Sequence, residues 1–382
     1  MKKALLVAAS AALAAPAFAQ SSSPASSVQL YGIVDLAYRY TSNEGTAASG
    51  SHKGSLTRMI GGGMSQSRIG INVNEDIGGG LRALANLEQR INAQNGSVFG
   101  PVASAPGTGF QQAWVGLQSS SLGRLTMGRQ YNVLFDLVTS TYASYPYSPY
   151  MEAYKPEIGM ALGARANSMF KYMIEVGPVR GALQYSSKNE GSPTGGATKG
   201  GYVRFAKDGL AAGIGYQDYA FGSGKKIKAW TMGGSYRTGD WYFNLGYGQN
   251  KVDSGLTPVD LAVLSAFWGG QSNGGFGGAG FLAANKRQMA TVGVNYKVTP
   301  QLTLGAHYFR ARQTGVTAAA KAHANFITVA ADYAFSKRTD MYLAVDRTTL
   351  SGDHVSLSSA RDNQANGAKS RLGVTVGLRH RF

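Results

Sequence analysis

Charged side chains alternate with apolar ones in two neighbouring segments early in the chain. Arg68, Arg82 and Arg90 share one face of these segments, with Glu88 as the acid among them. A period of two places such residues on one side of a β-strand. Cations fixed along a narrow, water-filled space act on passing ions through their electric field, without any bond making. The elements that must position them are therefore paired strands that enclose water.

Residue types suited to covalent catalysis or metal binding are missing or scattered. The chain has no Cys, which excludes disulfides, thiolate nucleophiles and thiolate metal sites. Its 5 His stand singly, without a His-x-x-x-His or similar ligand pair. A hydrolase set in a barrel rim would need His with Ser, or a pair of carboxylates, held together. We expect no enzyme, no metal and no cofactor.

The chain is strongly basic, with 37 Lys and Arg against 20 Asp and Glu, a formal charge of +17. The first residues resemble a secretory signal peptide: Lys2 and Lys3, an apolar run from Ala4 to Ala15, and the cleavage site Ala17-Phe18-Ala19. Removing residues 1–19 leaves 35 − 20 = +15. Export excludes a nucleic-acid partner. The excess base can then face anionic lipopolysaccharide, or it can line a pore that concentrates anions.

The last residues, Leu372 to Phe382, alternate strictly, with one face apolar apart from His380. A final strand ending in Phe resembles the last strand of Gram-negative outer-membrane barrels. We expect the barrel-assembly machinery to recognise Phe382, and its deletion to impair assembly more than function.

Alternating segments of about ten residues repeat along the whole of residues 20–382, joined in turn by short turns and long polar loops. A soluble sandwich would fill the second face with aliphatic side chains, whereas here it holds Arg, Glu, Asn, Gln, Thr and Gly. We therefore predict one all-β domain, a transmembrane antiparallel barrel of sixteen strands with an aqueous lumen. Short turns should be periplasmic, and the long segments 41–66, 92–108, 252–285 and 350–369 extracellular. The predicted strands are residues 27–40, 67–75, 81–91, 109–118, 123–130, 169–177, 179–187, 199–207, 209–218, 226–237, 240–251, 286–297, 301–312, 323–335, 339–349 and 370–382.

Aromatic residues gather near the predicted strand ends. Because they are spread over all strands, we interpret them as a girdle at the lipid–water boundary. Stacking platforms for sugars remain an alternative. The set is Tyr38, Tyr40, Tyr172, Tyr185, Tyr202, Tyr216, Trp230, Tyr236, Trp241, Tyr242, Tyr296, Tyr333 and Tyr342.

Motifs spread over the predicted domain resemble the Gram-negative general porins, of the subtype common in β-proteobacteria. Each motif is weak alone, but they occur in family order. They are Ser27-Val28-Gln29-Leu30-Tyr31-Gly32-Ile33-Val34-Asp35, Ser67-Arg68-Ile69-Gly70, Glu75-Asp76-Ile77-Gly78-Gly79-Gly80-Leu81, Ala113-Trp114-Val115-Gly116-Leu117, Gly128-Arg129-Gln130-Tyr131, Tyr333-Ala334-Phe335-Ser336-Lys337-Arg338-Thr339 and Val376-Gly377-Leu378-Arg379-His380-Arg381-Phe382.

The resemblance implies a homotrimer in which each barrel has its own pore, narrowed by an inward-folded third extracellular loop. By order this constriction loop covers about residues 132–168, and it carries the acids Asp136, Glu152 and Glu157. The resemblance also places Arg129 and Arg165 at the constriction. By strand parity Arg129 would face lipid, which conflicts with a position at the constriction. A bulge near Gly128, or the departure of the chain into the loop, would remove this conflict. Gln111 stands where relatives often have a base. The candidate constriction residues are Arg68, Arg129, Arg82, Arg90, Arg165, Asp136, Glu152 and Glu157.

The expected function is passive diffusion of small hydrophilic solutes and ions across the outer membrane, with anions preferred. The acids of the constriction loop oppose that preference. A ligand-selective channel for small anions such as dicarboxylates remains the alternative, and a structural or adhesive barrel is a third. The expected partners are a homotrimer, outer-membrane lipids and lipopolysaccharide, the assembly machinery, and small solutes.

Overall fold

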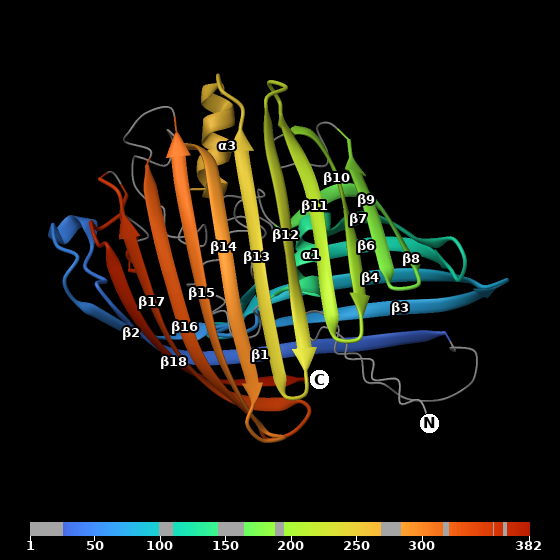
Figure 1. Ribbon diagram of the computed structural model, residues 1–382, viewed down its shortest axis with the longest axis horizontal. Helices are drawn as coiled ribbons and strands as arrows, with labels where there is room; N and C mark the ends of the chain where they lie inside the picture. Colours follow the sequence, from blue (N-terminus) through green and yellow to red (C-terminus); the bar gives the residue numbers. More distant parts are fainter. Residues whose placement is uncertain are drawn as a thin grey trace.

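The strands of the computed structural model form one closed antiparallel sheet, because β18 pairs with β1 (Figure 1). The structure describes residues 26–98, 110–143, 164–187, 195–268, 284–315, 321–353, 355–361 and 365–382. Strands β2 and β3 both pair with β1 and form two parts of one spanning strand, while β5 pairs only with β4. The barrel thus has sixteen spanning strands, which confirms the predicted fold class. The predicted signal peptide lies outside the described residues.

The spanning strands follow the predicted segments closely. Their bounds are β1 Ser27–Ser42, β2 Ser55–Gly61, β3 Arg68–Gly78, β4 Leu81–Asn92, β6 Gln112–Ser119, β7 Gly123–Tyr131, β8 Arg165–Val176, β9 Val179–Ser186, β10 Gly195–Lys207, β11 Leu210–Phe221, β12 Lys226–Thr238, β13 Trp241–Val252, β14 Ala284–Lys297, β15 Leu302–Gly315, β16 Ala322–Ala334, β17 Thr339–Ser351 and β18 Ser370–Arg381. The remaining elements are β5 Ser97–Val98, the 3₁₀ turn Ala47–Ser49, and the helices α1 Val133–Thr141 and α3 Pro258–Trp268. Neither helix, nor any other helical stretch of the described chain, offers an apolar run of the length needed to span a bilayer.

Tight turns close the barrel at one end and longer segments leave it at the other (Figure 1). Asp208 and Gly209 join β10 to β11, and both have positive φ, 51° and 84°. Two left-handed residues in succession are what a type I′ hairpin requires, and Asp-Gly is among its preferred pairs. This Asp-Gly turn fixes the register of β10 against β11 at the short-turn end.

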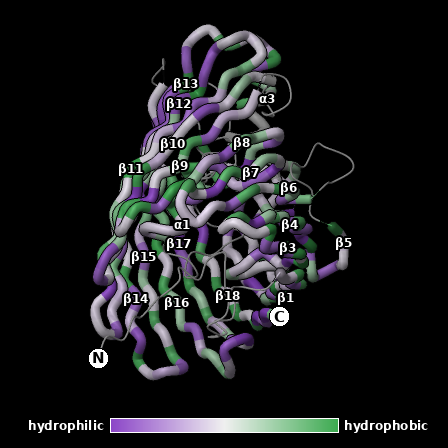
Figure 2. Tube along the Cα trace, turned by 90° about the vertical axis from the view of Figure 1, so that its right-hand side faces the viewer, coloured by the Kyte–Doolittle hydropathy of each residue, from purple (hydrophilic) through white to green (hydrophobic). Residues whose placement is uncertain are grey.

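Hydrophobic and polar residues succeed each other along each strand (Figure 2). On β1 the outward Val28 and Leu30 are 74% and 59% exposed, while the inward Asp35 and Arg39 are buried. Such a distribution inverts that of a soluble protein, because the apolar side chains face outward. It is stable only where lipid surrounds the barrel.

The predicted loop 41–66 contains a strand, β2, that the sequence did not reveal. Its inward residues are Leu56, Arg58 and Ile60 and its outward residues Ser55, Thr57 and Met59, so polar and apolar side chains occur on both faces. Ile60 packs with Met64, Tyr342 and other side chains in a buried inner cluster, which explains its inward position.

Residues 62–67, between β2 and β3, are held by the carboxylate of Asp35. It accepts N–H groups from Gly63, Met64 and Ser65 at 3.1, 3.1 and 2.6 Å. The hydroxyl of Tyr342 on β17 donates to the same carboxylate at 2.5 Å. This one acid satisfies backbone groups that an interrupted strand leaves unpaired.

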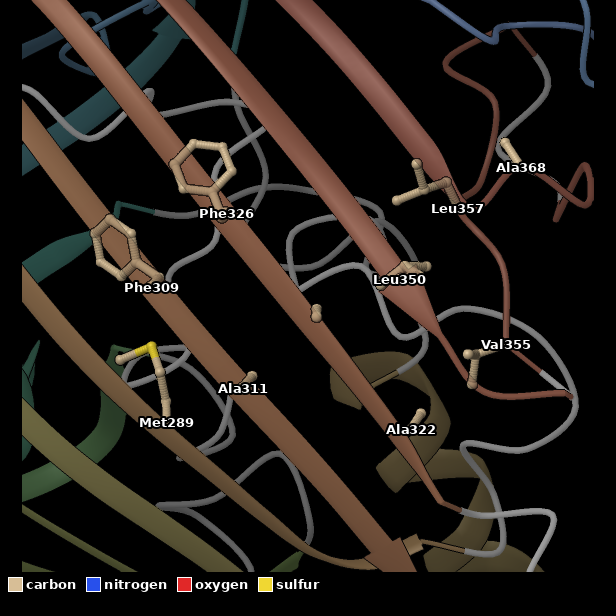
Figure 3. Close-up of a cluster of buried hydrophobic side chains, with 10 residues drawn as sticks. Met289, Phe309, Ala311, Ala322, Phe326, Leu350, Val355, Leu357 and Ala368 are labelled. Atoms are coloured by element: carbon tan, nitrogen blue, oxygen red, sulfur yellow. The ribbon is translucent and has the colours of Figure 1, made fainter.

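The last long segment packs against the inner wall near the mouth of the barrel, a position that its Ser- and Gly-rich composition did not predict. Val355, Leu357 and Ala368 belong to one buried cluster with Phe326 and Leu350 of the wall, and Figure 3 shows them on the side of Leu350. Glu44 ties this segment to the first loop, because it accepts from the Ala360 N–H at 2.6 Å. Glu44 also pairs with Arg371 of β18 at 2.9 Å.

Most of the predicted girdle aromatics are exposed on the outside, but some of them are turned inward. Tyr202 and Tyr342 are 4% and 2% exposed, and Tyr242 donates to the Ala143 carbonyl oxygen at 3.1 Å. For these residues the girdle interpretation is wrong, because their parity along the strand points them into the lumen.

Candidate pore constriction

Helix α1, which opens the predicted constriction loop, lies inside the barrel against β9–β12 (Figure 1). Asn132 caps its first turn by accepting from the Phe135 N–H at 2.9 Å. Val133, Leu134 and Leu137 are buried against the wall. The loop is thereby fixed to one side of the lumen over its described part, residues 132–143 and 164–168.

Glycines on the inner wall make room for this segment. A Cβ at Gly246 would lie 2.3 Å from the ring of Tyr142, and one at Gly213 would lie 2.6 Å from Leu137. Tyr142 is further held by Thr231 through its hydroxyl and by Asn244, whose side-chain amide donates to its carbonyl oxygen at 2.7 Å. Because these wall positions carry no side chain, the loop can pack closely against the backbone of the wall.

We predict that Gly246→Val displaces Tyr142 and loosens the loop. The three atoms nearest to an added Cβ all belong to the Tyr142 ring, and overpacking of this kind costs about 1–3 kcal/mol. Single-channel recordings should show higher conductance and more open-channel noise than the wild type. Gly181→Val is the control, because the nearest atom to its Cβ is 3.9 Å away. Unchanged conductance and noise in Gly246→Val would contradict this role of the loop.

Arg68 and Arg90 stand directly opposite each other across β3 and β4, and both face inward. Glu88 lies beside them, 3.7 Å from Arg68 Nε, and it also accepts from the Tyr31 hydroxyl at 3.2 Å. Like charges in register destabilise a sheet unless something compensates them. Glu88 supplies one negative charge for two positive ones.

Tyr131 connects this wall to the end of the constriction loop. Its hydroxyl accepts from Arg165 at 2.7 Å and from Arg90 at 3.4 Å. The Arg165 guanidinium also lies 4.3 Å from the Tyr131 ring centre, and Phe135 stacks on the ring at 4.0 Å. The structure thus brings Arg68, Arg90 and Arg165 into one series.

Arg129 does not join that series directly. The register of β7 and β8 shifts between Gly128 and Gln130, so the predicted bulge exists, but its extra residue lies in β8, where Ser168 has a φ of 45°. By strand parity Arg129 shares the face of Leu125 and Met127, although the alternation of burial ends at Gln130 and Tyr131, which are both buried. Its side chain donates to the Phe110 carbonyl oxygen at 3.1 Å and contacts Asn167.

The other candidates fall in different places. Arg82 lies near the short-turn end of β4, eight residues and about 26 Å along the strand from Arg90. Glu152 and Glu157 lie outside the described residues. Gln111 is buried beside β6, and its backbone N–H donates to the Glu88 carbonyl oxygen at 2.7 Å.

Asp136 on α1 forms an ion pair with Lys171 on the inner face of β8, at 2.6 Å. Lys171 also donates to the Tyr131 carbonyl oxygen at 2.8 Å. Of the three loop acids that oppose an anion preference, Asp136 is therefore neutralised by a cation of the wall. Sequence reasoning missed Lys171 and Tyr131, although Lys171 shares the inward parity of Met169 and could have been found from it.

The arrangement defines a membrane-spanning barrel with a charged, water-lined interior and a loop folded into it. Within the described ranges, no three His, Asp or Glu side chains gather as a metal-binding group. A family profile for Gram-negative porins matches residues 4–353, and the chain belongs to this family of the outer membrane.

Comparisons with individual proteins agree with this assignment. The chain is 38% identical over 146 residues to an outer membrane porin of Bordetella pertussis, covering 35% of this chain, and 30% identical over 226 residues to outer membrane porin protein 32 of Delftia acidovorans, covering 56%. It spans 34% and 59% of the lengths of these curated relatives. The anion-selective porin from Comamonas acidovorans has the same fold, with a TM-score of 0.69 at 24% identity over 94% of this chain and 100% of that one. A trimer form of the outer membrane protein OmpT of Vibrio cholerae is also similar, with a TM-score of 0.62 at 16% identity over 94% of this chain and 100% of that one.

Proposed function

We propose that the chain forms a water-filled pore for passive diffusion of small hydrophilic solutes, with a preference for anions. The observation that carries this proposal is the series Arg68, Arg90 and Arg165, which has Glu88 as its neighbouring acid. Because Asp136 is paired with Lys171, it adds little negative field of its own. Fixed positive charge between low-dielectric walls raises the local concentration of anions and the barrier for cations. The porin from Comamonas acidovorans, which has the same fold, is anion-selective, and this supports the same direction.

Recording the refolded protein in planar bilayers tests the proposal. We expect ohmic channels whose zero-current potential across a KCl gradient has the sign of chloride permeation. The preference should weaken with salt, since the Debye length falls from about 10 Å at 0.1 M to about 3 Å at 1 M. Cation preference of the wild type would overturn it. Saturation of the current by micromolar dicarboxylate would favour the ligand-selective channel instead.

We propose a homotrimer as the assembled state, because a similar fold occurs in a trimer form. Insertions should then add conductance in groups of three equal steps.

We also propose that the assembly machinery recognises Phe382. Its backbone pairs with Gly32 at 3.0 and 3.1 Å, while the residue remains 44% exposed.

The family and the fold are those of channels rather than enzymes. One Gly-x-Ser-x-Gly does occur, at Gly270 to Gly274, in a segment outside the described residues. We propose no reaction for it.

A further inference from the structure

Three lysines stand in register on the outer surface of the barrel. Lys228 on β12 lies opposite Lys251 on β13, and Lys251 lies opposite Lys286 on β14. Adjacent strands are about 4.8 Å apart, so the three Cα atoms fall within about 10 Å. Like charges directly opposite each other destabilise a sheet. Such a row calls for a compensating negative charge.

The row continues onto β15. Arg312 stands opposite Gln288, two residues along β14 from Lys286, and Arg310 stands opposite Ala290. Both arginines are exposed and share the outward face. We call Lys228, Lys251, Lys286, Arg310 and Arg312 the basic row.

The barrel's own acids compensate one member of the basic row. Asp253 lies 3.3 Å from Lys228 Nζ, and Asp218 lies 3.3 Å from Lys226 nearby. In the part of the chain that the structure describes, no carboxylate forms an ion pair with the other four members. The segments 269–283 and 316–320, which follow α3 and β15, contain no Asp or Glu in their sequences.

The position of the basic row relative to lipid follows from the residues beneath it. Tyr216 stands opposite Trp230, and Trp230 lies 5.4 Å from Tyr247, so aromatic rings line the outer face next to the row. Nearer the middle of the strands come the lipid-facing side chains Leu245 and Val292, 62% and 54% exposed. Aromatic rings mark the lipid–water boundary. Lys228, Lys251 and Lys286 therefore lie at headgroup depth, at the end with the long loops, and Arg312 and Arg310 follow in register with the aromatic residues Trp230 and Tyr247.

The basic row is confined to one side of the barrel. At the same end of the opposite wall, the outward positions of β1, β2 and β4 hold Tyr40, Thr57 and Ile91. Further outward cations stand singly, on β7 (Arg129), on β10 (Lys199, opposite Asp218) and on β17 (Arg347). A general solubilising charge would be spread around the rim. The concentration on β12–β15 instead indicates a localised anionic partner.

We propose that the basic row binds the phosphate groups of lipopolysaccharide in the outer leaflet. A phosphate offers several charged acceptor oxygens, and each can take charge-assisted hydrogen bonds from Lys and Arg on adjacent strands. The lipid chains then lie against the apolar belt below the row. The proposal uses the outer-membrane location and does not depend on ion selectivity.

The test is a titration of the folded protein in detergent with diphosphoryl lipid A, followed by native mass spectrometry. The triple variant Lys251→Gln, Lys286→Gln, Arg312→Gln should bind about 100-fold more weakly, since each Lys or Arg near an anionic surface contributes roughly a factor of five. The matched control, Lys207→Gln, Lys297→Gln, Lys337→Gln, removes the same charge from exposed positions at the short-turn end and should bind like the wild type.

Two further arms identify the ligand. Dephosphorylated lipid A should bind the wild type about as weakly as diphosphoryl lipid A binds the triple variant, and inorganic phosphate at the same concentration should not compete. Equal affinity of wild type and triple variant, or no dependence on the lipid phosphates, would overturn the proposal. The conductance of the triple variant should be unchanged, because its replaced side chains face outward. A wild type that binds the lipid but conducts no ions would reject the pore function and leave this site intact.

Discussion

Replacing Arg90 and Arg165 by Gln is expected to remove most of the anion preference of the pore. Both guanidinium groups meet at the Tyr131 hydroxyl, where the loop and the wall approach each other. A unit charge about 8 Å from a permeating ion in a water-like dielectric contributes about 0.5 kcal/mol. Its sign is opposite for cations, so each lost charge should lower the anion-to-cation permeability ratio by up to about fivefold. The measurement is the zero-current potential in a low-salt gradient.

The control for this prediction removes the same charge outside the lumen. Lys337 and Arg338 lie exposed in the turn between β16 and β17, and their replacement by Gln should leave the potential at the wild-type value. Arg129→Gln should have a smaller effect than Arg165→Gln, because the Arg129 guanidinium is held by the Phe110 carbonyl oxygen and Asn167 rather than at the Tyr131 hydroxyl. If the double variant Arg90→Gln, Arg165→Gln retains full anion preference, the selectivity site lies elsewhere in the lumen.

Much of the barrel follows from its sequence, because lipid outside and water inside impose opposite polarity on successive residues. The inward position of Arg68 and Arg90 could be predicted from parity alone. The proximity of Arg90 to Arg165 could not be predicted. Both bind the Tyr131 hydroxyl, and strand parity alone does not place Tyr131 between them. The pairing of Asp136 with Lys171 joins a loop helix to a strand, and no local pattern encodes that approach.

The errors share one physical cause. Where a loop folds into the lumen, the inner wall becomes a protein core and its polarity reverses. Ile60 on β2, and Phe309 and Phe326 on β15 and β16, face inward because loop residues cover them. A pattern that assumes a wet lumen throughout therefore misses β2. The same pattern also assigns Tyr342 to the girdle, although the Tyr342 hydroxyl donates a hydrogen bond to Asp35 inside the barrel.

The closure of the barrel is expected to depend strongly on Arg39. From β1 it donates to Asp346 on β17 at 2.6 and 3.0 Å and to Thr375 on the intervening β18 at 2.7 Å. Both charged side chains are 2% exposed. Gly373 makes the approach possible, because a Cβ there would lie 2.3 Å from Arg39 Nη2. The pair thus bridges the seam where the first and last strands meet.

Arg39→Met should lower the free energy of unfolding by about 3–5 kcal/mol, because it leaves the Asp346 carboxylate buried without its cation. Adding Asp346→Leu should recover most of that loss, since the paired apolar side chains leave no buried charge uncompensated. Urea titration of the folded protein in lipid vesicles, read by gel mobility, measures both variants. Arg180→Met is the comparison, because its Glu175 partner is 57% exposed and such pairs contribute less than about 1 kcal/mol. A loss in Arg39→Met no larger than that in Arg180→Met would mean that the seam is held by its backbone ladder rather than by this ion pair.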